Sequence, residues 1–187
     1  MAGALFSNQT FQSQTALEPG EYEDCIFADC QLAGINLSSY VFDHCQWVRC
    51  DLSNVVVQET AFRDNSFDEC KLLGIHFEDV NTFSLSLHFK DCILNYASFF
   101  QLKIPGTEFL GCKMEEVNLE EADLRRAVFR DCMLVNSSFS YANLEEADFR
   151  TALQFSINPE HCKLKGARFS RHNLEGLLVS CQIRIEP

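Results

Sequence analysis

The sequence predicts an all-β fold: a four-sided solenoid of about eight parallel coils, with a cap at each end. Two observations lead to this fold class. Large apolar residues recur at every fifth position from Tyr22 to Phe77, and the series resumes from Phe89 to Phe149 after a slip of two residues. A small residue stands two positions before most of them. A period of five matches neither an amphipathic helix nor an ordinary strand, so it indicates a repeat architecture.

The five-residue period is contained in a period of twenty. When the large positions are aligned every twenty residues, one column is almost entirely Phe: Phe27, Trp47, Phe67, Phe89, Phe109, Phe129, Phe149 and Phe169. Four units of five therefore close one turn, and each side contributes a short extended segment that pairs with the coils above and below. Side chains alternate along such a segment, so the large residue and the small residue two before it both point inward. We expect this column to lie in the core.

The cysteines follow the same pattern. Nine of the ten occupy the small inward position, and six form a ladder: Cys30, Cys50, Cys70, Cys92, Cys112 and Cys132. Cysteine at such positions behaves as a small buried apolar residue. A disulfide needs Cβ atoms about 3.8 Å apart, closer than stacked coils allow. The alternative is a metal or redox ladder, but the chain has no CxxC motif and no histidine among the rungs. We therefore expect no cofactor, no metal site and no disulfide.

Interruptions of the pattern divide the chain. Phe6 and Phe11 are out of register with the main series, so residues 1–20 are expected to form an N-terminal cap. The repeats fill residues 21–175, with a small insertion near 79–84 and an irregular stretch near 152–161, where Gln154 and Pro159 break the columns. The insertion is expected to be a bulge or short loop, since the columns keep their phase after it.

Residues 176–187 are expected to form a C-terminal cap or tail, with a short helix as one option. The chain is densely apolar here, and such a surface either covers the last coil or joins two copies. The candidate residues for this cap or homodimer surface are Leu174, Leu177, Leu178, Val179, Ile183 and Ile185.

The net charge of −12 restricts the partners. A strongly acidic protein is repelled by phosphate backbones and anionic membranes, so we expect basic protein partners and no direct contact with nucleic acid or membrane. The N-terminal segment has no basic region followed by an apolar core, as a signal peptide would, and no apolar run reaches the length of a membrane span. A cytoplasmic location is the expectation.

One group of acidic residues is a candidate interaction surface. Five carboxylates fall on consecutive sides of one coil, and two more lie a coil further on: Glu115, Glu116, Glu120, Glu121 and Asp123, then Glu145 and Glu146. The simpler interpretation is a solvated face that keeps the protein soluble. The alternative is a mimic of DNA. A duplex about 38 Å long carries roughly 22 charges, more than the −12 of the whole chain, so mimicry would be confined to part of the surface.

The sequence offers little support for catalysis. The five histidines are expected on different sides and levels, without a Ser/His/Asp or Cys/His partnership. No glycine-rich phosphate loop and no HExxH motif is present. We expect a protein that is not an enzyme.

Several units resemble the A-(D/N)-(L/F)-x-x consensus of the pentapeptide-repeat family. These are Ala122-Asp123-Leu124, Ala142-Asn143-Leu144 and Ala147-Asp148-Phe149, and Cys25-Ile26-Phe27 is similar to a common variant. The resemblance implies a right-handed quadrilateral β-helix. The cysteine-rich repeats and the segment Ile157-Asn158-Pro159-Glu160 are similar to the microcin B17 immunity and quinolone-resistance (Qnr) subgroups.

Members of those subgroups are understood as DNA mimics that bind DNA gyrase or topoisomerase IV, often as dimers joined at their C-terminal ends. The resemblance therefore implies protection from topoisomerase-targeting toxins or quinolones. Two features depart from the subgroups: the insertion has only two extra residues, and basic side chains interrupt the acidic surface. A pentapeptide-repeat scaffold with no topoisomerase role is the alternative.

Overall fold

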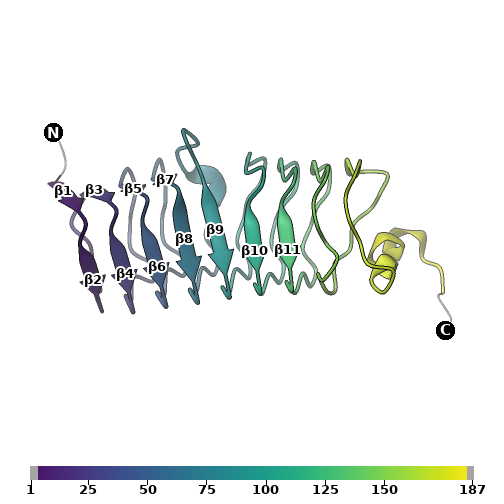
Figure 1. The fold of residues 1–187 in the computed structure, drawn as a ribbon, viewed down its shortest axis with the longest axis horizontal. Coiled ribbons are helices and arrows are strands. Elements are labelled where there is room, and N and C mark those ends of the chain that lie inside the picture. The colour runs from purple at the N-terminus through teal and green to yellow at the C-terminus, as the bar shows by residue number, and fades with distance from the viewer. Residues whose placement is uncertain (1–3, 185–187) are drawn as a thin grey trace.

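The computed structural model describes residues 4–184 and shows a solenoid of parallel coils stacked along one axis (Figure 1). Two sheets of parallel strands form two adjacent sides. One sheet has the order β1-β3-β5-β7, with β1 (Ala4–Ser7), β3 (Gly20–Glu23), β5 (Val41–Asp43) and β7 (Ala61–Arg63). The other has the order β11-β10-β9-β8-β6-β4-β2, with β2 (Thr10–Gln12), β4 (Ile26–Ala28), β6 (Gln46–Val48), β8 (Asn65–Asp68), β9 (Leu87–Lys90), β10 (Glu108–Leu110) and β11 (Val128–Arg130).

The register of the strands confirms the predicted period of twenty. Phe27 pairs with Trp47, and Phe109 pairs with Phe129. The third and fourth sides of each coil have no regular strand and are connected by isolated bridges, such as Asp51↔Lys71 and Asn118↔Ser138. The four-sided β-solenoid predicted from the sequence is therefore present.

Regular strands cover fewer turns than the eight coils expected. The larger sheet has seven strands, and six turns of the chain separate its first strand, β2, from its last, β11. Beyond β11 the same side continues only through the isolated bridges Val128↔Asp148 and Asp148↔Arg168. Each five-residue unit on this side then has a single bridging residue, so the coils continue without a regular strand.

The predicted core column is a continuous stack of rings. Successive centroids lie 4.0 Å apart for Phe27 and Trp47, 4.6 Å for Phe129 and Phe149, and 5.3 Å for Phe149 and Phe169. Stacked aromatic pairs add a favourable energy beyond that of their buried area. All members are buried except Phe169, which is half-buried because it lies in the last coil.

The N-terminal segment, expected as a cap, continues both sheets by one coil. Phe6 pairs with Tyr22 and Phe11 with Phe27. These partners are sixteen residues apart instead of twenty, which explains why Phe6 and Phe11 are out of register in the sequence. The first coil is therefore shorter than the others, and its two strands are the outermost strands of their sheets.

The two extra residues lie between Asn81 and the start of β9 at Leu87. Ala61 still pairs with Asn81 at a separation of twenty, whereas Asn65 pairs with Leu87 at twenty-two. A 3-10 turn, η1 (Phe77–Asp79), precedes this loop. The loop presents Phe83, whose side chain is 72% exposed, to solvent.

The C-terminal residues form two 3-10 turns, η2 (Leu174–Leu177) and η3 (Val179–Cys181), instead of an α-helix. The amide side chain of Asn173 holds η2 by donating to the carbonyls of Phe149 and Ala152, at 2.8 and 3.0 Å. The Ile157 amide donates to the Gly176 carbonyl at 2.9 Å. No helix in residues 4–184 has the length and apolar character needed to cross a membrane.

Candidate interaction surface

The candidate acidic residues of the central coil lie on two corners and one side of the solenoid. Glu115 accepts a hydrogen bond from the Asn95 side chain at 3.2 Å, and Glu121 accepts one from Gln101 at 2.8 Å. Both donors lie one coil earlier, so each of these hydrogen bonds links two neighbouring coils along the rod. Glu116 and Glu121 are exposed, and the others of this coil are partly buried.

Arginine neutralises part of this surface. The Arg125 guanidinium donates to both carboxylate oxygens of Asp123, each at 2.8 Å, and this contact lowers the pKa of Asp123. The backbone amide of Arg126 donates to the Glu145 carbonyl at 2.8 Å, which places Glu145 and Glu146 one coil beyond Arg125 and Arg126. Basic residues therefore stand between the two predicted acidic groups.

The charge is distributed unevenly along the rod. Residues 1–91 hold 14 acidic and 4 basic side chains, whereas residues 92–187 hold 13 and 11. The net charge is therefore −10 in the first half and −2 in the second. The predicted acidic group lies in the second half, so the largest excess of negative charge lies outside it.

All four basic residues of the first half are paired with carboxylates. Arg49 contacts Asp29 at 2.8 Å and Lys90 contacts Asp68 at 2.9 Å, while Arg63 and Lys71 lie 3.5 and 4.0 Å from Asp43 and Asp51. The first half therefore has no unpaired Lys or Arg left to neutralise its other carboxylates. In the second half, nine basic residues have no ion pair among residues 4–184: Lys103, Lys113, Arg126, Arg130, Lys163, Lys165, Arg168, Arg171 and Arg184.

Two histidines from different coils lie beside one carboxylate, that of Asp64. His44 Nε2 is 3.8 Å from Asp64 Oδ2, and His88 Nε2 is 3.6 Å from Asp64 Oδ1. The insertion hides this neighbourhood in the sequence, because it shifts His88 by two residues relative to the period of twenty. Within residues 4–184 no group of three or more His, Cys, Asp or Glu side chains is arranged to hold a metal ion.

The cysteine ladder is buried. Five of its six thiols donate to backbone carbonyls of the preceding coil, for example Cys50 to Phe27 at 3.3 Å and Cys132 to Phe109 at 3.2 Å. All ten cysteines are free, and the six rungs are among the eight that are buried. Burial raises the pKa of the Cys30 thiol to about 11. The rungs fill the small inward positions of the core, as predicted.

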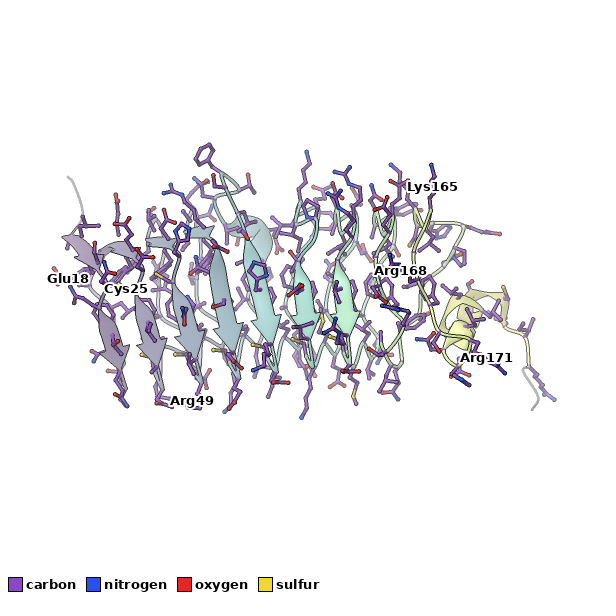
Figure 2. The ribbon with its side chains drawn as sticks, in the orientation of Figure 1. Glu18, Cys25, Arg49, Lys165, Arg168 and Arg171 are labelled. Carbon is purple, nitrogen blue, oxygen red and sulfur yellow. The ribbon has the colours of Figure 1, made fainter. Side chains whose placement is uncertain are left out.

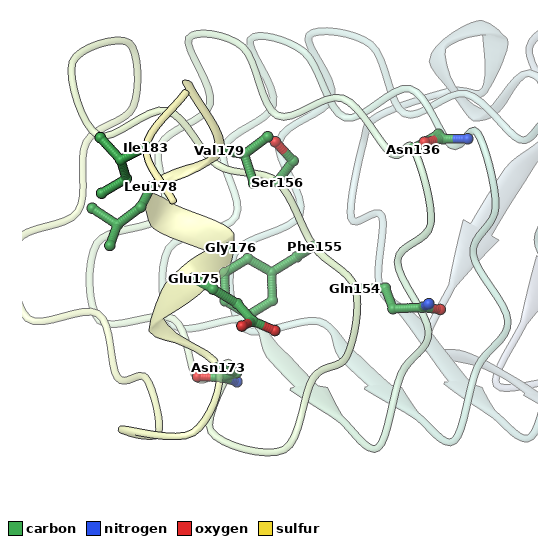
Figure 3. A pocket seen from close by; sticks show the side chains of 10 residues that line it. All are labelled: Asn136, Gln154, Phe155, Ser156, Asn173, Glu175, Gly176, Leu178, Val179 and Ile183. Atoms are coloured by element: carbon green, nitrogen blue, oxygen red, sulfur yellow. The ribbon is translucent and has the colours of Figure 1, made fainter. Parts of the chain in front are cut away.

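A groove of about 600 Å³ lies between the last regular coils and the C-terminal turns (Figure 3). Phe155, Leu178, Val179 and Ile183 line its apolar part. The candidate cap or dimer residues differ in exposure: Leu174 is 44%, Leu178 37%, Val179 57% and Ile183 57% exposed. Leu177 packs against the core, and Ile185 lies outside the described residues.

Comparison with known proteins agrees with this architecture. A family model described as a pentapeptide repeat region matches residues 21–99 and 102–178. The chain belongs to the pentapeptide-repeat family. The columns of period twenty, the short first coil and the two-residue insertion are thus details of a pentapeptide-repeat solenoid. No curated protein matches the sequence.

Two solved structures share the fold at low sequence identity. A trypsin-treated form of QnrB1, a plasmid-mediated fluoroquinolone resistance protein, is 14% identical with a TM-score of 0.64, and 99% of each chain is covered. A second trypsin-treated QnrB1 structure is 17% identical with a TM-score of 0.56, covering 100% of this chain and 93% of the other. HetL, involved in heterocyst differentiation regulation in Nostoc sp. strain PCC 7120, is 13% identical with a TM-score of 0.42, covering 91% and 86%.

Proposed function

We propose that this protein acts without catalysis, as an acidic rod that occupies the DNA-binding surface of DNA gyrase or topoisomerase IV. It would thereby protect the enzyme from toxins or quinolones. The fold that it shares with QnrB1, a fluoroquinolone resistance protein, supports this choice of partner. A solenoid without a topoisomerase role, acting as a scaffold for another protein, is the second candidate.

The charge density of the first half is the observation that carries the proposal. Residues 1–91 span four turns from Phe11 to Phe89, which is about 19 Å at the spacing of parallel strands. Duplex DNA of that length carries about 11 phosphate charges. The first half carries a net charge of −10. This half therefore resembles DNA in linear charge density, and the second half, at −2, does not.

A supercoiling assay with purified bacterial DNA gyrase, with and without ciprofloxacin, tests the proposal. The wild-type protein is expected to inhibit supercoiling or to reduce the number of drug-induced breaks. If it shows no inhibition, no protection and no binding to gyrase or topoisomerase IV, the topoisomerase role is wrong and the scaffold function stands.

Two sets of neutral variants locate the surface. Glu21→Gln, Glu23→Gln, Glu59→Gln and Glu69→Gln remove four charges from the first half, where these carboxylates have no ion pair. Glu115→Gln, Glu116→Gln, Glu120→Gln and Glu121→Gln remove the same charge from the predicted group. The first set is expected to weaken the effect about tenfold or more, and the second set to weaken it less. The reverse order would place the surface in the second half.

A further inference from the structure

At both ends of the solenoid, the described residues 4–184 leave backbone groups without a partner on the same two sides. β1 and β2 are the outermost strands of their sheets at the N-terminal end. At the C-terminal end the same two sides finish with the segments around Leu164 and Phe169, which are linked to earlier coils by the bridges Asn143↔Lys163 and Asp148↔Arg168. The 3-10 turns η2 and η3 lie beside the groove at Phe155, and Asn173, just before η2, is hydrogen-bonded to Ser170.

The unpaired backbone groups at the two ends are complementary. Inside the rod, the amide of each large residue donates to the next coil, as Leu144 does to the Lys163 carbonyl and Phe149 to the Arg168 carbonyl, both at 2.8 Å. The amides of Leu164 and Phe169 have no such bond among residues 4–184. The amide of the residue just before each large position points the other way, towards the preceding coil. The amide of Ile26, for example, donates to the Gln9 carbonyl of the preceding coil at 2.9 Å. Leu5 and Thr10 occupy that position in the first coil, which no described coil precedes.

The apolar columns are also open at both ends. Phe6 and Phe11 at one end, and Leu164 and Phe169 at the other, are only partly buried although they pack against the core. Stacking one rod on the next would continue both columns, with Leu164 against Phe6 and Phe169 against Phe11. Residues 1–17 contain no charged side chain, whereas proteins commonly protect exposed edge strands with charge or proline.

The charges near the two ends are opposite. Residues 1–48 contain six acidic side chains and no Lys or Arg. Residues 161–184 contain five Lys or Arg and one acidic residue, Glu175, and Lys165, Arg168 and Arg171 spread across the last coil (Figure 2). Contact between two N-terminal ends, or between two C-terminal ends, would therefore bring like charges together. Contact between an N-terminal and a C-terminal end brings opposite charges together.

We propose that copies of this chain associate head to tail, with β1 and β2 of one copy continuing the last coil of another. This contact is heterologous, so it leaves a free end on each side and builds open chains of rods instead of a closed dimer. Because opposite charges steer the ends together, added salt weakens the association.

The mass of the wild-type protein in solution is the first measurement. By sedimentation or light scattering, it is expected to exceed 21.3 kDa increasingly with concentration at about 20 mM salt, and to fall towards this monomer mass at about 500 mM. A mass of 21.3 kDa under all these conditions would overturn the proposal.

A mixing experiment distinguishes the geometry. Leu5→Pro with Thr10→Pro blocks the N-terminal end, because proline removes an edge amide that faces away from the rod. Lys165→Glu, Arg168→Glu and Arg171→Glu block the C-terminal end. Each blocked variant is expected to be monomeric alone, and their equimolar mixture is expected to form a heterodimer. Circular dichroism and the melting temperature show whether each variant keeps the fold.

Matched controls separate the end contact from general effects. Thr10→Val with Leu5→Val keeps both edge amides, and Lys103→Glu, Lys113→Glu and Arg126→Glu make the same charge change in the middle of the rod. Both controls are expected to associate more readily than the blocked variants. Dimers of the N-blocked variant alone would show a C-terminal seam, and dimers of the C-blocked variant alone an N-terminal one. Either result contradicts head-to-tail contact.

Discussion

Left-handed backbone at the corners is the main local strain in this chain. The second residue after a large position has a positive φ at most corners, including Arg126 at +60° and Gly106 at +77°, which share one corner on successive coils. A residue with a Cβ atom pays roughly 1–2 kcal/mol in this conformation, and glycine does not. The corners therefore tolerate Glu, Arg and Tyr only because the stacked coils on both sides hold the chain in place.

Substitutions at this corner measure the strain. Nothing lies within 4 Å of a Cβ atom built on Gly106, so Gly106→Ala tests the backbone alone and is expected to destabilise the protein by about 1 kcal/mol. Arg126→Gly should raise the melting temperature slightly, because the relieved strain exceeds the roughly 0.5–1 kcal/mol of chain entropy that glycine costs. Thermal unfolding followed by circular dichroism checks both substitutions. A Gly106→Ala protein as stable as the wild type would contradict the assignment of strain.

At the scale of the element, the cysteine ladder shows what a period of twenty can and cannot predict. The large and small inward positions were predictable from Phe27 to Phe149, because repeated packing on equivalent coils requires the same sizes at the same intervals. Asn65 replaces the cysteine that stands at the equivalent inward position of the two preceding coils, Cys25 and Cys45. Only the structure shows the reason: the Asn65 amide nitrogen donates to the Phe42 carbonyl at 2.8 Å, and its oxygen accepts from the indole of Trp47 at 3.2 Å.

Thiol reactivity tests the ladder. At pH 8, a disulfide reagent that reacts with thiolates is expected to modify the exposed Cys181 quickly and the partly buried Cys162 slowly. The eight buried cysteines should remain unmodified, because burial raises the pKa of thiols such as Cys45 to about 12 and leaves them protonated. Unfolding in denaturant should expose all ten. Rapid modification of more than two thiols in the folded protein would show that the ladder opens.

At the scale of the whole molecule, the two halves should respond differently to salt. Repulsion among acids is concentrated in residues 1–91, so screening should stabilise those coils most. Hydrogen exchange of the N-blocked variant, in which end-to-end contact is removed, is expected to slow more in residues 20–75 than in 100–150 when salt rises from about 20 to about 300 mM. Equal slowing in both halves would contradict this, and Glu21→Gln with Glu23→Gln should reduce the difference.

Two features that the sequence did not reveal depend on a change of period. The first coil has sixteen residues, and the two extra residues before β9, which the sequence did predict, bring His88 beside Asp64. Each of these moves a residue relative to its neighbours by an amount that columns of twenty cannot show. The uneven charge was readable from the sequence, but its importance depends on which coils lie at the ends and on which cations are already paired.

The loop between Asn81 and Leu87 has a practical consequence. Two residues are added there, yet Phe67 and Phe89 still stack at 5.3 Å and every later column keeps its place. Loop closure becomes only slightly less favourable as a loop lengthens. This corner is therefore a natural graft site: a longer peptide inserted beside Phe83 should be displayed at the side of the rod while the coils on both sides remain in register.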